Sequence, residues 1–301
     1  MIVALIKAMR PHQWVKNLLV FASLVFAHKL GDVEAIQRSV MAFCVFCLLS
    51  SSVYLLNDVV DAEADRAHPR KRLRPIAAGT LSVPVAMLAA AVFSTSALVW
   101  SWMLSQGQGE QATPFILLPA LYLGLQIAYS LFLKRILIVD CVCVALGFLL
   151  RVDAGSRVLT DVDSSSWLLL CTFFFSLFVA FCKRRNEVVK VSDGTGATRE
   201  TMKRYTEKFL DPVISSLAAI SILSYALYTQ AEQTVKEHDS KNLIITVPLV
   251  VYGVFRYQYL VQDRGEGGDP SRLLFRDRGL ILSGLAYAVT VWLAMTVNPL
   301  F

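Results

Sequence analysis

Three aspartates stand at the end of a long apolar run, in the stretch NDVVDAEAD at residues 57–65. If the helix predicted for that run continues into the stretch, each residue turns about 100° around the helix axis. The residues that then share one face are Asn57, Asp58, Asp61 and Asp65. Glu63 points to the other side. The spacing therefore predicts a surface of three carboxylates and one amide.

Carboxylates held this close repel one another unless a cation lies between them. Mg²⁺ prefers oxygen ligands and is commonly held by one or two carboxylates together with substrate phosphates. The predicted metal ligands are Asn57, Asp58, Asp61 and Asp65, and the three aspartates are the predicted catalytic residues. The alternative is an exposed acidic helix end that forms salt bridges with the arginines that follow. Carboxylates at a membrane edge are costly and tend to be functional, which favours the metal site.

The elements that position these residues are predicted to be membrane-spanning helices. The chain has 301 residues, of which 55% are hydrophobic and 17% charged, with a mean hydropathy of +0.55. This is too apolar for a soluble domain, so the predicted fold class is an all-α polytopic membrane protein, with a single domain over residues 1–301. A bilayer core takes roughly 20 apolar residues of helix, which predicts about nine spans. They cover residues 14–30, 38–56, 81–105, 113–133, 136–151, 165–182, 211–231, 242–261 and 279–298.

Lysine and arginine predict the orientation of these helices, because cytoplasmic loops collect them. Most of the 29 basic residues fall in the N-terminal segment and in alternate loops. This places the N-terminus and the acidic end of the second span in the cytoplasm, in a multi-pass protein of the inner (plasma) membrane. The same topology explains the net charge of +6, so no nucleic-acid partner is expected.

The remaining sequence features indicate no second chemistry. All six cysteines lie in apolar runs with no histidine at metal-ligand spacing, so neither a disulfide framework nor a zinc site is indicated. No cleavable signal peptide is evident. The glycine-rich stretch RGEGGDPSR, residues 264–272, is either a lid over a cytoplasmic site or a plain connector. The oligomeric state is left open, a homo-oligomer included.

The acidic stretch carries a resemblance to a known family. Its pattern of Asn57, Asp58, Asp61 and Asp65 resembles the NDxxDxxxD motif of the UbiA superfamily of intramembrane prenyltransferases, and RPIAAG at residues 74–79 is similar to the sequence that follows the motif there. About nine helices with the motif after the second also resemble that superfamily, over nearly the whole chain. The resemblance implies a central cavity that opens to the cytoplasmic side, with Mg²⁺ as cofactor.

A second aspartate-rich motif follows the sixth helix in typical members and holds Mg²⁺ for a prenyl diphosphate. Here the corresponding place reads FCKRRNEVVKVSD, which offers Glu187 and Asp193 but leads with Lys183, Arg184 and Arg185. A cation-rich segment suits phosphates bound directly, with arginine making bidentate contacts and lysine acting as a point charge. The departure argues against a prenyl-diphosphate donor.

Several stretches closely resemble the decaprenyl-phosphate phosphoribosyltransferase branch of the superfamily. They are RPHQWVKN at 10–17, HPRKRLRPIAAG at 68–79, YSLFLKRILIVD at 129–140, GFLLRVDAGS at 147–156 and KRRNE at 183–187. This resemblance implies transfer of phosphoribose from phosphoribosyl pyrophosphate to a polyprenyl phosphate, toward the lipid-linked arabinose donor of some bacterial cell walls. A phosphate monoester is already nucleophilic at neutral pH, so positioning and electrostatics would suffice for catalysis.

The residues expected to bind these substrates are Lys16, Asn57, Arg74, Tyr129, Lys134, Asp140, Lys183, Arg184 and Glu187. The residues expected to grip phosphates are Arg74, Lys134, Lys183 and Arg184, and Lys16 is expected to help at the headgroup level. Positive-inside bias explains Lys134, and interfacial anchoring explains Tyr129, nearly as well as a substrate role. Glu187 either completes the metal site or neutralises nearby arginines. Asp140 either lines the substrate cavity or pairs with Lys134 or Arg135.

Two other functions stay open. A UbiA-type enzyme that moves a prenyl group from a prenyl diphosphate to an aromatic or other acceptor would carry an aspartate pair where KRRNE stands. A transporter would carry its intramembrane charges near the bilayer midplane on several helices. The charges of this sequence cluster at one membrane face, which argues against a transporter.

Overall fold

The computed structural model describes residues 1–69, 71–106, 114–159, 162, 164–192, 204–238, 241–265, 273–274 and 276–296. Every regular element in these ranges is a helix, which confirms the predicted all-α class. The chain divides into two compact units, Met1–Ser164 and Ser165–Phe301. The single domain predicted from the sequence is not decided by this division and stays a prediction.

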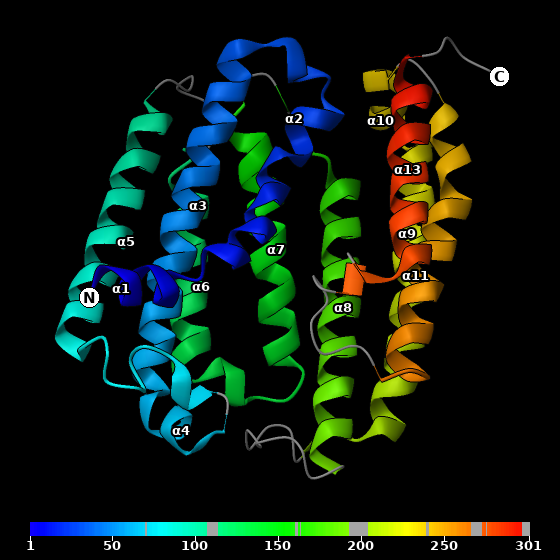
Figure 1. Ribbon diagram of the computed structural model, residues 1–301. Helices are drawn as coiled ribbons and strands as arrows, with labels where there is room; N and C mark the ends of the chain where they lie inside the picture. Colours follow the sequence, from blue (N-terminus) through cyan, green and yellow to red (C-terminus); the bar gives the residue numbers. More distant parts are fainter. Residues whose placement is uncertain are drawn as a thin grey trace. The chain divides into compact units, whose positions relative to one another are not determined.

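The first unit is built around one long helix, α3. Its elements are α1 (Ile2–Met9), η1 (Pro11–Phe21), α2 (Ala22–Phe26), η2 (Lys29–Gly31), α3 (Val33–Val60), α4 (Ala62–Ala67), η3 (Lys71–Leu73), α5 (Val83–Ser105), α6 (Leu117–Leu131), η4 (Leu133–Arg135) and α7 (Val139–Arg157). α3 packs against α5 and α6, and α7 packs against α6 and η1. α1 runs across the direction of α3, which it contacts (Figure 1).

In its described residues, the second unit has four long helices and two short ones with defined bounds. Its elements are α8 (Ser166–Ser192), α9 (Glu207–Gln230), α10 (Glu232–His238), η6 (Asn242–Thr246), α11 (Val247–Gln262) and α13 (Arg278–Thr296). α8 packs along α9, and α11 packs against α8, α9 and α13. Asp277 accepts from Leu280 N at 3.0 Å and pairs with Arg256 at 2.8 Å, which ties α13 to α11. The Arg256 guanidinium lowers the pKa of the Asp277 carboxyl.

In the part of the chain that the structure describes, five helices are long and apolar enough to cross a membrane: Val33–Val60, Val83–Ser105, Ser166–Lys190, Glu207–Gln230 and Asn242–Gln262. Leu117–Leu131 and Arg278–Ala294 are shorter apolar helices. α7 also covers a predicted span, but it carries several polar residues. These helices account for the predicted spans from residue 38 onward, and the number that cross a membrane stays a prediction.

The first predicted span, residues 14–30, is wrong as one continuous α-helix. It folds as the end of η1, the short α2 and the start of η2. The reason is a buried polar residue, Asn17, which lies inside η1. Its amide donates to Ser50 Oγ on α3 at 3.2 Å. The side-chain contact fixes η1 against α3, where the sequence showed only a short apolar run.

η1 lies unusually close to α7 at one glycine. A Cβ added to Gly155 would lie 2.1 Å from the backbone oxygen of Val20. One residue on, Ser156 Oγ lies 2.6 Å from Ser23 Oγ, so a hydrogen bond joins α7 to α2. Only glycine fits this approach, because the obstructing atom is backbone and cannot rotate away.

Gly155→Ala is therefore expected to lower the midpoint of thermal unfolding by several degrees. Overpacking a tight interface costs about 1–3 kcal/mol, and here a backbone segment must move. The matched control is Gly124→Ala on α6, where an added Cβ meets nothing within 4 Å. That variant should equal or exceed the wild type in thermal unfolding in the same detergent, because alanine favours helix over glycine. Equal midpoints for both variants would contradict the close approach.

Candidate active site

The acidic stretch lies where α3 ends and α4 begins. Asp61 is the C-cap of α3, with φ −92° and ψ 4°, so the helix bends there. The helical spacing persists across the bend, because Asp61 N donates to Asn57 O at 2.9 Å and Asp65 N donates to Asp61 O at 2.8 Å. Asp58 and Asp65 are buried, whereas Glu63 is exposed. The exposure of Glu63 agrees with the face predicted from the sequence.

Two arginines neutralise the buried pair of aspartates. Arg74 Nη1 lies 3.2 Å from Asp58 Oδ1 and 2.6 Å from Asp65 Oδ2, so one guanidinium joins both. Arg10 also donates to Asp58 Oδ1. Arg10 follows α1 in the left-handed conformation, with φ 55°, and its guanidinium lies 4.9 Å from the ring centre of Tyr54. α1 thus delivers a second cation to the end of α3.

A lysine joins the other two residues of the motif. Lys134 Nζ lies 2.6 Å from Asp61 Oδ1 and 3.3 Å from Asn57 Oδ1. Lys134 is only 6% exposed and lies on the short η4, which follows α6. The ion pairs of the alternative interpretation are present, but they lie in a buried cluster rather than on an exposed helix end.

The residues of this cluster fit a magnesium ion in their chemistry. Among the described residues, no three His, Cys, Asp or Glu side chains are gathered as metal ligands, and each carboxylate of the motif turns toward a basic side chain. All donors are nevertheless oxygens, which Mg²⁺ prefers. Asp58 Oδ2 is buried and has no hydrogen-bond partner in the described part of the chain. A buried carboxylate oxygen left unpaired is costly, and a bound cation would relieve it.

Three further predicted residues belong to the first unit. Tyr129 is half-buried in the last turn of α6, ahead of Lys134. Asp140 is 1% exposed in the first turn of α7. Lys16 is half-buried on η1, next to the buried Asn17. Their roles in substrate binding stay predictions.

In the second unit, the stretch KRRNE lies on α8 and its cations differ from one another. Lys183 is exposed, whereas Arg184 is buried and pairs with Glu187 at 2.5 Å. Arg185 binds Asp211 Oδ1 at 2.6 Å and Val261 O at 3.1 Å, which clamps α8 to α9 and α11. The pairing of Glu187 with Arg184 favours the neutralising role for Glu187. Asp193 and residues 266–272 of the glycine-rich stretch lie outside the described residues.

Arg10 is the residue of the cluster that sequence reasoning missed. It begins the stretch RPHQWVKN, which supported the family resemblance, and no role was predicted for its charge. Its contact with Asp58 joins residues 48 positions apart, so no local spacing reveals it. The signal available was a basic residue directly before Pro11, where the helix of α1 has to end.

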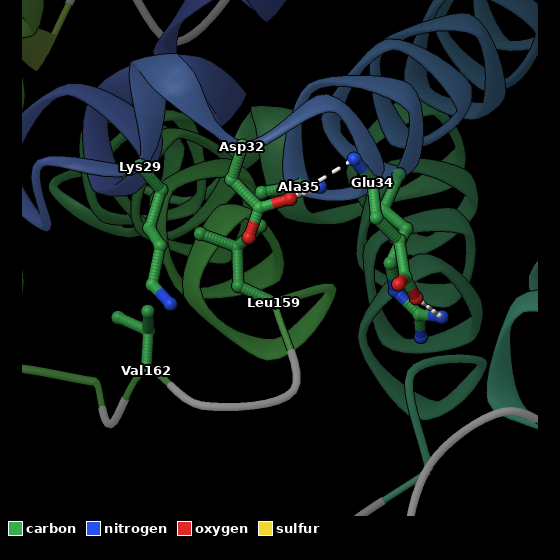
Figure 2. A pocket seen from close by; sticks show the side chains of 7 residues that line it. Lys29, Asp32, Glu34, Ala35, Leu159 and Val162 are labelled. Atoms are coloured by element: carbon green, nitrogen blue, oxygen red, sulfur yellow. Dashed lines mark hydrogen bonds and ion pairs between the residues drawn. The ribbon is translucent and has the colours of Figure 1, made fainter.

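A small pocket lies at the other end of α3 and does not belong to this cluster. Figure 2 shows its lining residues, which are Lys29, Asp32, Glu34, Ala35, Arg38, Leu159 and Val162. Its volume is about 60 Å³, whereas pockets for drug-sized ligands measure about 300–1,000 Å³. Asp32 is engaged in capping α3, and Arg38 donates to Val158 O at 2.7 Å. The acidic cluster therefore remains the candidate active site.

Comparison with known proteins decides the family. The model of the UbiA prenyltransferase family matches residues 18–276, a range that runs through both compact units. The chain belongs to the UbiA prenyltransferase family. With its apolar helices, this membership makes it a membrane-embedded protein, as predicted from its composition.

Two UbiA relatives are similar over nearly their full length. The decaprenyl-phosphate phosphoribosyltransferase of Mycolicibacterium smegmatis is 36% identical over 304 residues, covering 97% of this chain and 92% of the relative. The protein of the same name from Mycobacterium tuberculosis (strain CDC 1551 / Oshkosh) is 37% identical over 300 residues, covering 98% and 95%. Both names agree with the branch that the sequence stretches resemble.

A solved UbiA structure shares the fold. The UbiA homologue from Archaeoglobus fulgidus bound to GPP and Mg²⁺ superposes with a TM-score of 0.71 and 19% identity, covering 97% of this chain and 99% of that one. At this identity the likeness concerns the fold alone. It confirms a UbiA-type fold, whereas the nine spans and the cavity open to the cytoplasm stay predictions.

Proposed function

We propose that this UbiA-family protein transfers 5-phosphoribose from phosphoribosyl pyrophosphate to a polyprenyl phosphate and releases pyrophosphate. The observation that carries the proposal is the near full-length similarity to two relatives named decaprenyl-phosphate phosphoribosyltransferase. The cluster at the end of α3 supports it, because three basic side chains stand among the carboxylates there. Such a mixture suits a substrate that brings both phosphate oxygens and a metal ion.

In the reaction, the bond from the anomeric carbon to the pyrophosphate oxygen breaks, and a bond from a phosphate oxygen of the lipid to that carbon forms from the opposite face. Mg²⁺ held by Asp58, Asp61, Asp65 and Asn57 would supply charge neutralisation for the leaving pyrophosphate. Arg74 and Lys134 contact these ligands and offer N–H donors to the phosphate oxygens. Arg10, the residue directly after α1, donates to Asp58 and would orient its carboxylate. No strong general base is required of the chain.

The proposal includes a cellular setting. The protein would lie in the inner membrane with about nine spans, and its N-terminus and the acidic cluster would face the cytoplasm, where phosphoribosyl pyrophosphate is soluble. The excess of basic residues in alternate loops supports this orientation. The product would serve as a precursor of cell-wall arabinan, with decaprenyl phosphate as the acceptor that the relatives' name indicates.

Transfer of a prenyl group from a prenyl diphosphate is the second candidate function, and it is tested in parallel. The family description names prenyltransferases, and the archaeal homologue was solved with GPP and Mg²⁺. A prenyl diphosphate donor would use the same acidic cluster. Against it stands KRRNE on α8, where Lys183, Arg184 and Arg185 occupy the place expected for a second aspartate pair.

The deciding experiment compares the two donors on purified wild-type protein in lipid nanodiscs. One mixture holds phosphoribosyl pyrophosphate, Mg²⁺ and a polyprenyl phosphate, and the other a prenyl diphosphate, Mg²⁺ and an aromatic acid. A phosphoribosylated lipid, detected by mass spectrometry together with released pyrophosphate, is expected in the first mixture and is lost on adding EDTA. Turnover in the second mixture alone would overturn the proposal.

A further inference from the structure

Arg151 is a buried arginine without a carboxylate partner among the described residues. It lies on α7 and is 6% exposed. Its hydrogen-bond acceptors are neutral: Asn17 Oδ1 at 2.8 Å, Gly147 O at 2.7 Å and Tyr122 OH at 2.7 Å. No ion pair of Arg151 occurs within the described ranges, whereas the buried Arg184 and Arg185 each pair with a carboxylate. The charge cannot be lost by deprotonation, because a guanidinium stays protonated in proteins.

The cluster around Arg151 has more donors than acceptors. A guanidinium carries five N–H groups, and three of them are used in the bonds to Asn17, Gly147 and Tyr122. The hydroxyl of Tyr122 accepts from Arg151, and its own O–H has no acceptor among the described residues. The Asn17 amide donates to Ser50 Oγ and Cys47 Sγ on α3, which fixes its oxygen toward Arg151. Buried positive charge with spare donors is the chemistry that binds an anion.

Helix α3 connects this cluster to the acidic one. Cys47 and Ser50 stand eight to eleven residues before Asp58, or about 12–16 Å along a helix. Tyr54 lies between them on α3, and the guanidinium of Arg10 lies 4.9 Å from its ring centre. The guanidinium of Arg151 also lies over the rings of Tyr122 and Phe148, at 4.7 Å and 5.4 Å, which holds it in place without neutralising it.

We propose that Arg151, Asn17 and Tyr122 form an anion subsite that binds the phosphate monoester of a substrate. The proposal rests on the proposed function, in which the donor carries such a group on its ribose and the acceptor carries one at the end of its lipid. Ionised groups inside a membrane protein are costly and mark substrate sites, and a phosphate monoester supplies the negative charge that the chain does not. The acidic end of α3 would hold the pyrophosphate of the donor, and this subsite would hold the phosphate monoester of either the donor or the acceptor.

Binding to the wild type is tested first, without metal and without turnover. In EDTA, thermal unfolding is measured with ribose 5-phosphate and with a short-chain prenyl phosphate, each against its uncharged control, ribose or the prenyl alcohol. One of the two phosphates is expected to raise the unfolding midpoint, and which one names the source of the monoester. If neither exceeds its control, the subsite is overturned. This binding measurement does not depend on the transfer assay. It therefore still tests the subsite if the proposed function turns out to be wrong.

Kinetics of variants then assign the residue. Arg151→Gln is expected to raise the KM for one phosphate-monoester substrate about tenfold or more, with kcat changed much less, since a hydrogen bond to a charged group contributes about 1.5–3 kcal/mol. A higher KM for phosphoribosyl pyrophosphate assigns the ribose phosphate, and a higher KM for the lipid assigns the acceptor. Tyr122→Phe, which keeps the guanidinium, should raise the same KM to a smaller extent and serves if the first variant does not fold.

The matched control is Arg38→Gln, at the other end of α3. Arg38 donates to Val158 O at 2.7 Å and to Leu104 O at 3.2 Å, so it clamps helices without facing the acidic cluster. This variant should lose thermal stability with both KM values unchanged. If Arg151→Gln, or Tyr122→Phe in its place, also leaves both KM values unchanged, Arg151 is a structural clamp like Arg38 and the proposal is wrong.

Discussion

Asp58→Asn is expected to lower kcat roughly 100- to 1,000-fold, the range reported when one preorganised electrostatic group is removed from a site. Asp58 is 1% exposed, and its Oδ1 accepts from both Arg10 and Arg74. Its Oδ2 has no partner in the described residues and is the oxygen proposed to meet the metal. An amide of the same shape removes the charge and turns an NH₂ group toward either the guanidinium groups or the metal. Both arrangements are repulsive.

The control for this variant lies in the same stretch. Glu63→Gln makes the same change of charge on α4, where the side chain is exposed and outside the cluster. Its kcat should stay within about twofold of the wild type, since exposed charges contribute little. Steady-state transfer is measured for both variants over a range of Mg²⁺ concentrations. Equal loss in the two would mean that net charge at the helix end matters and that the face drawn from helical spacing is wrong.

The acidic face could be predicted because its cause is local. Helical periodicity alone separates Glu63 from the three aspartates, and the hydrogen bonds from Asp61 to Asn57 and from Asp65 to Asp61 keep that periodicity through the bend. The bend itself was not predicted. It leaves the relation of the side chains intact because it changes the direction of the axis more than the rotation about it.

The partners of the acids could be predicted only in part. Arg74 and Lys134 were expected to bind phosphates, which stays a prediction, and their ion pairs with Asp65 and Asp61 were not expected. Arg10 and Arg151 were not expected at all. Their contacts join residues far apart in the sequence, and they depend on how η1 lies against α3 and α7, which Gly155 and Asn17 decide by packing. The hydropathy of the sequence shows only a short apolar run there and gives no sign that η1 contacts α3 and α7.

The cations of KRRNE show how much the partners of a charge matter. Lys183 and Arg184 were expected to bind phosphates, which stays a prediction, because the sequence shows charges but not their partners. Arg185 turns out to clamp α8 to α9 through Asp211, and Arg184 pairs with Glu187 on its own helix. Lys183 is the exposed cation of the three. A test of phosphate binding on α8 should therefore begin with Lys183, since changing Arg185 would disturb the bundle.

Lys134→Gln is expected to lower kcat/KM roughly 100-fold, since a hydrogen bond to a charged group contributes about 1.5–3 kcal/mol and Lys134 donates to both Asn57 and Asp61. Its Nζ joins Asn57 and Asp61 in a buried position, so it sets the place of both oxygens as well as the local charge. The neighbouring Arg135 lies on the same η4 and is exposed. Arg135→Gln should therefore change kcat/KM less than about threefold.

A double variant separates placement from charge. If Lys134 acts through Asp61, the pair Lys134→Gln and Asp61→Asn will be non-additive, and the double variant will be little worse than the poorer single one. If Lys134 only contributes general positive potential, the losses will multiply and Arg135→Gln will show a comparable loss. The comparison thus tests whether the contact between η4 and the end of α3 belongs to Lys134. The sequence alone shows two adjacent basic residues, Lys134 and Arg135, and does not tell which of them makes this contact.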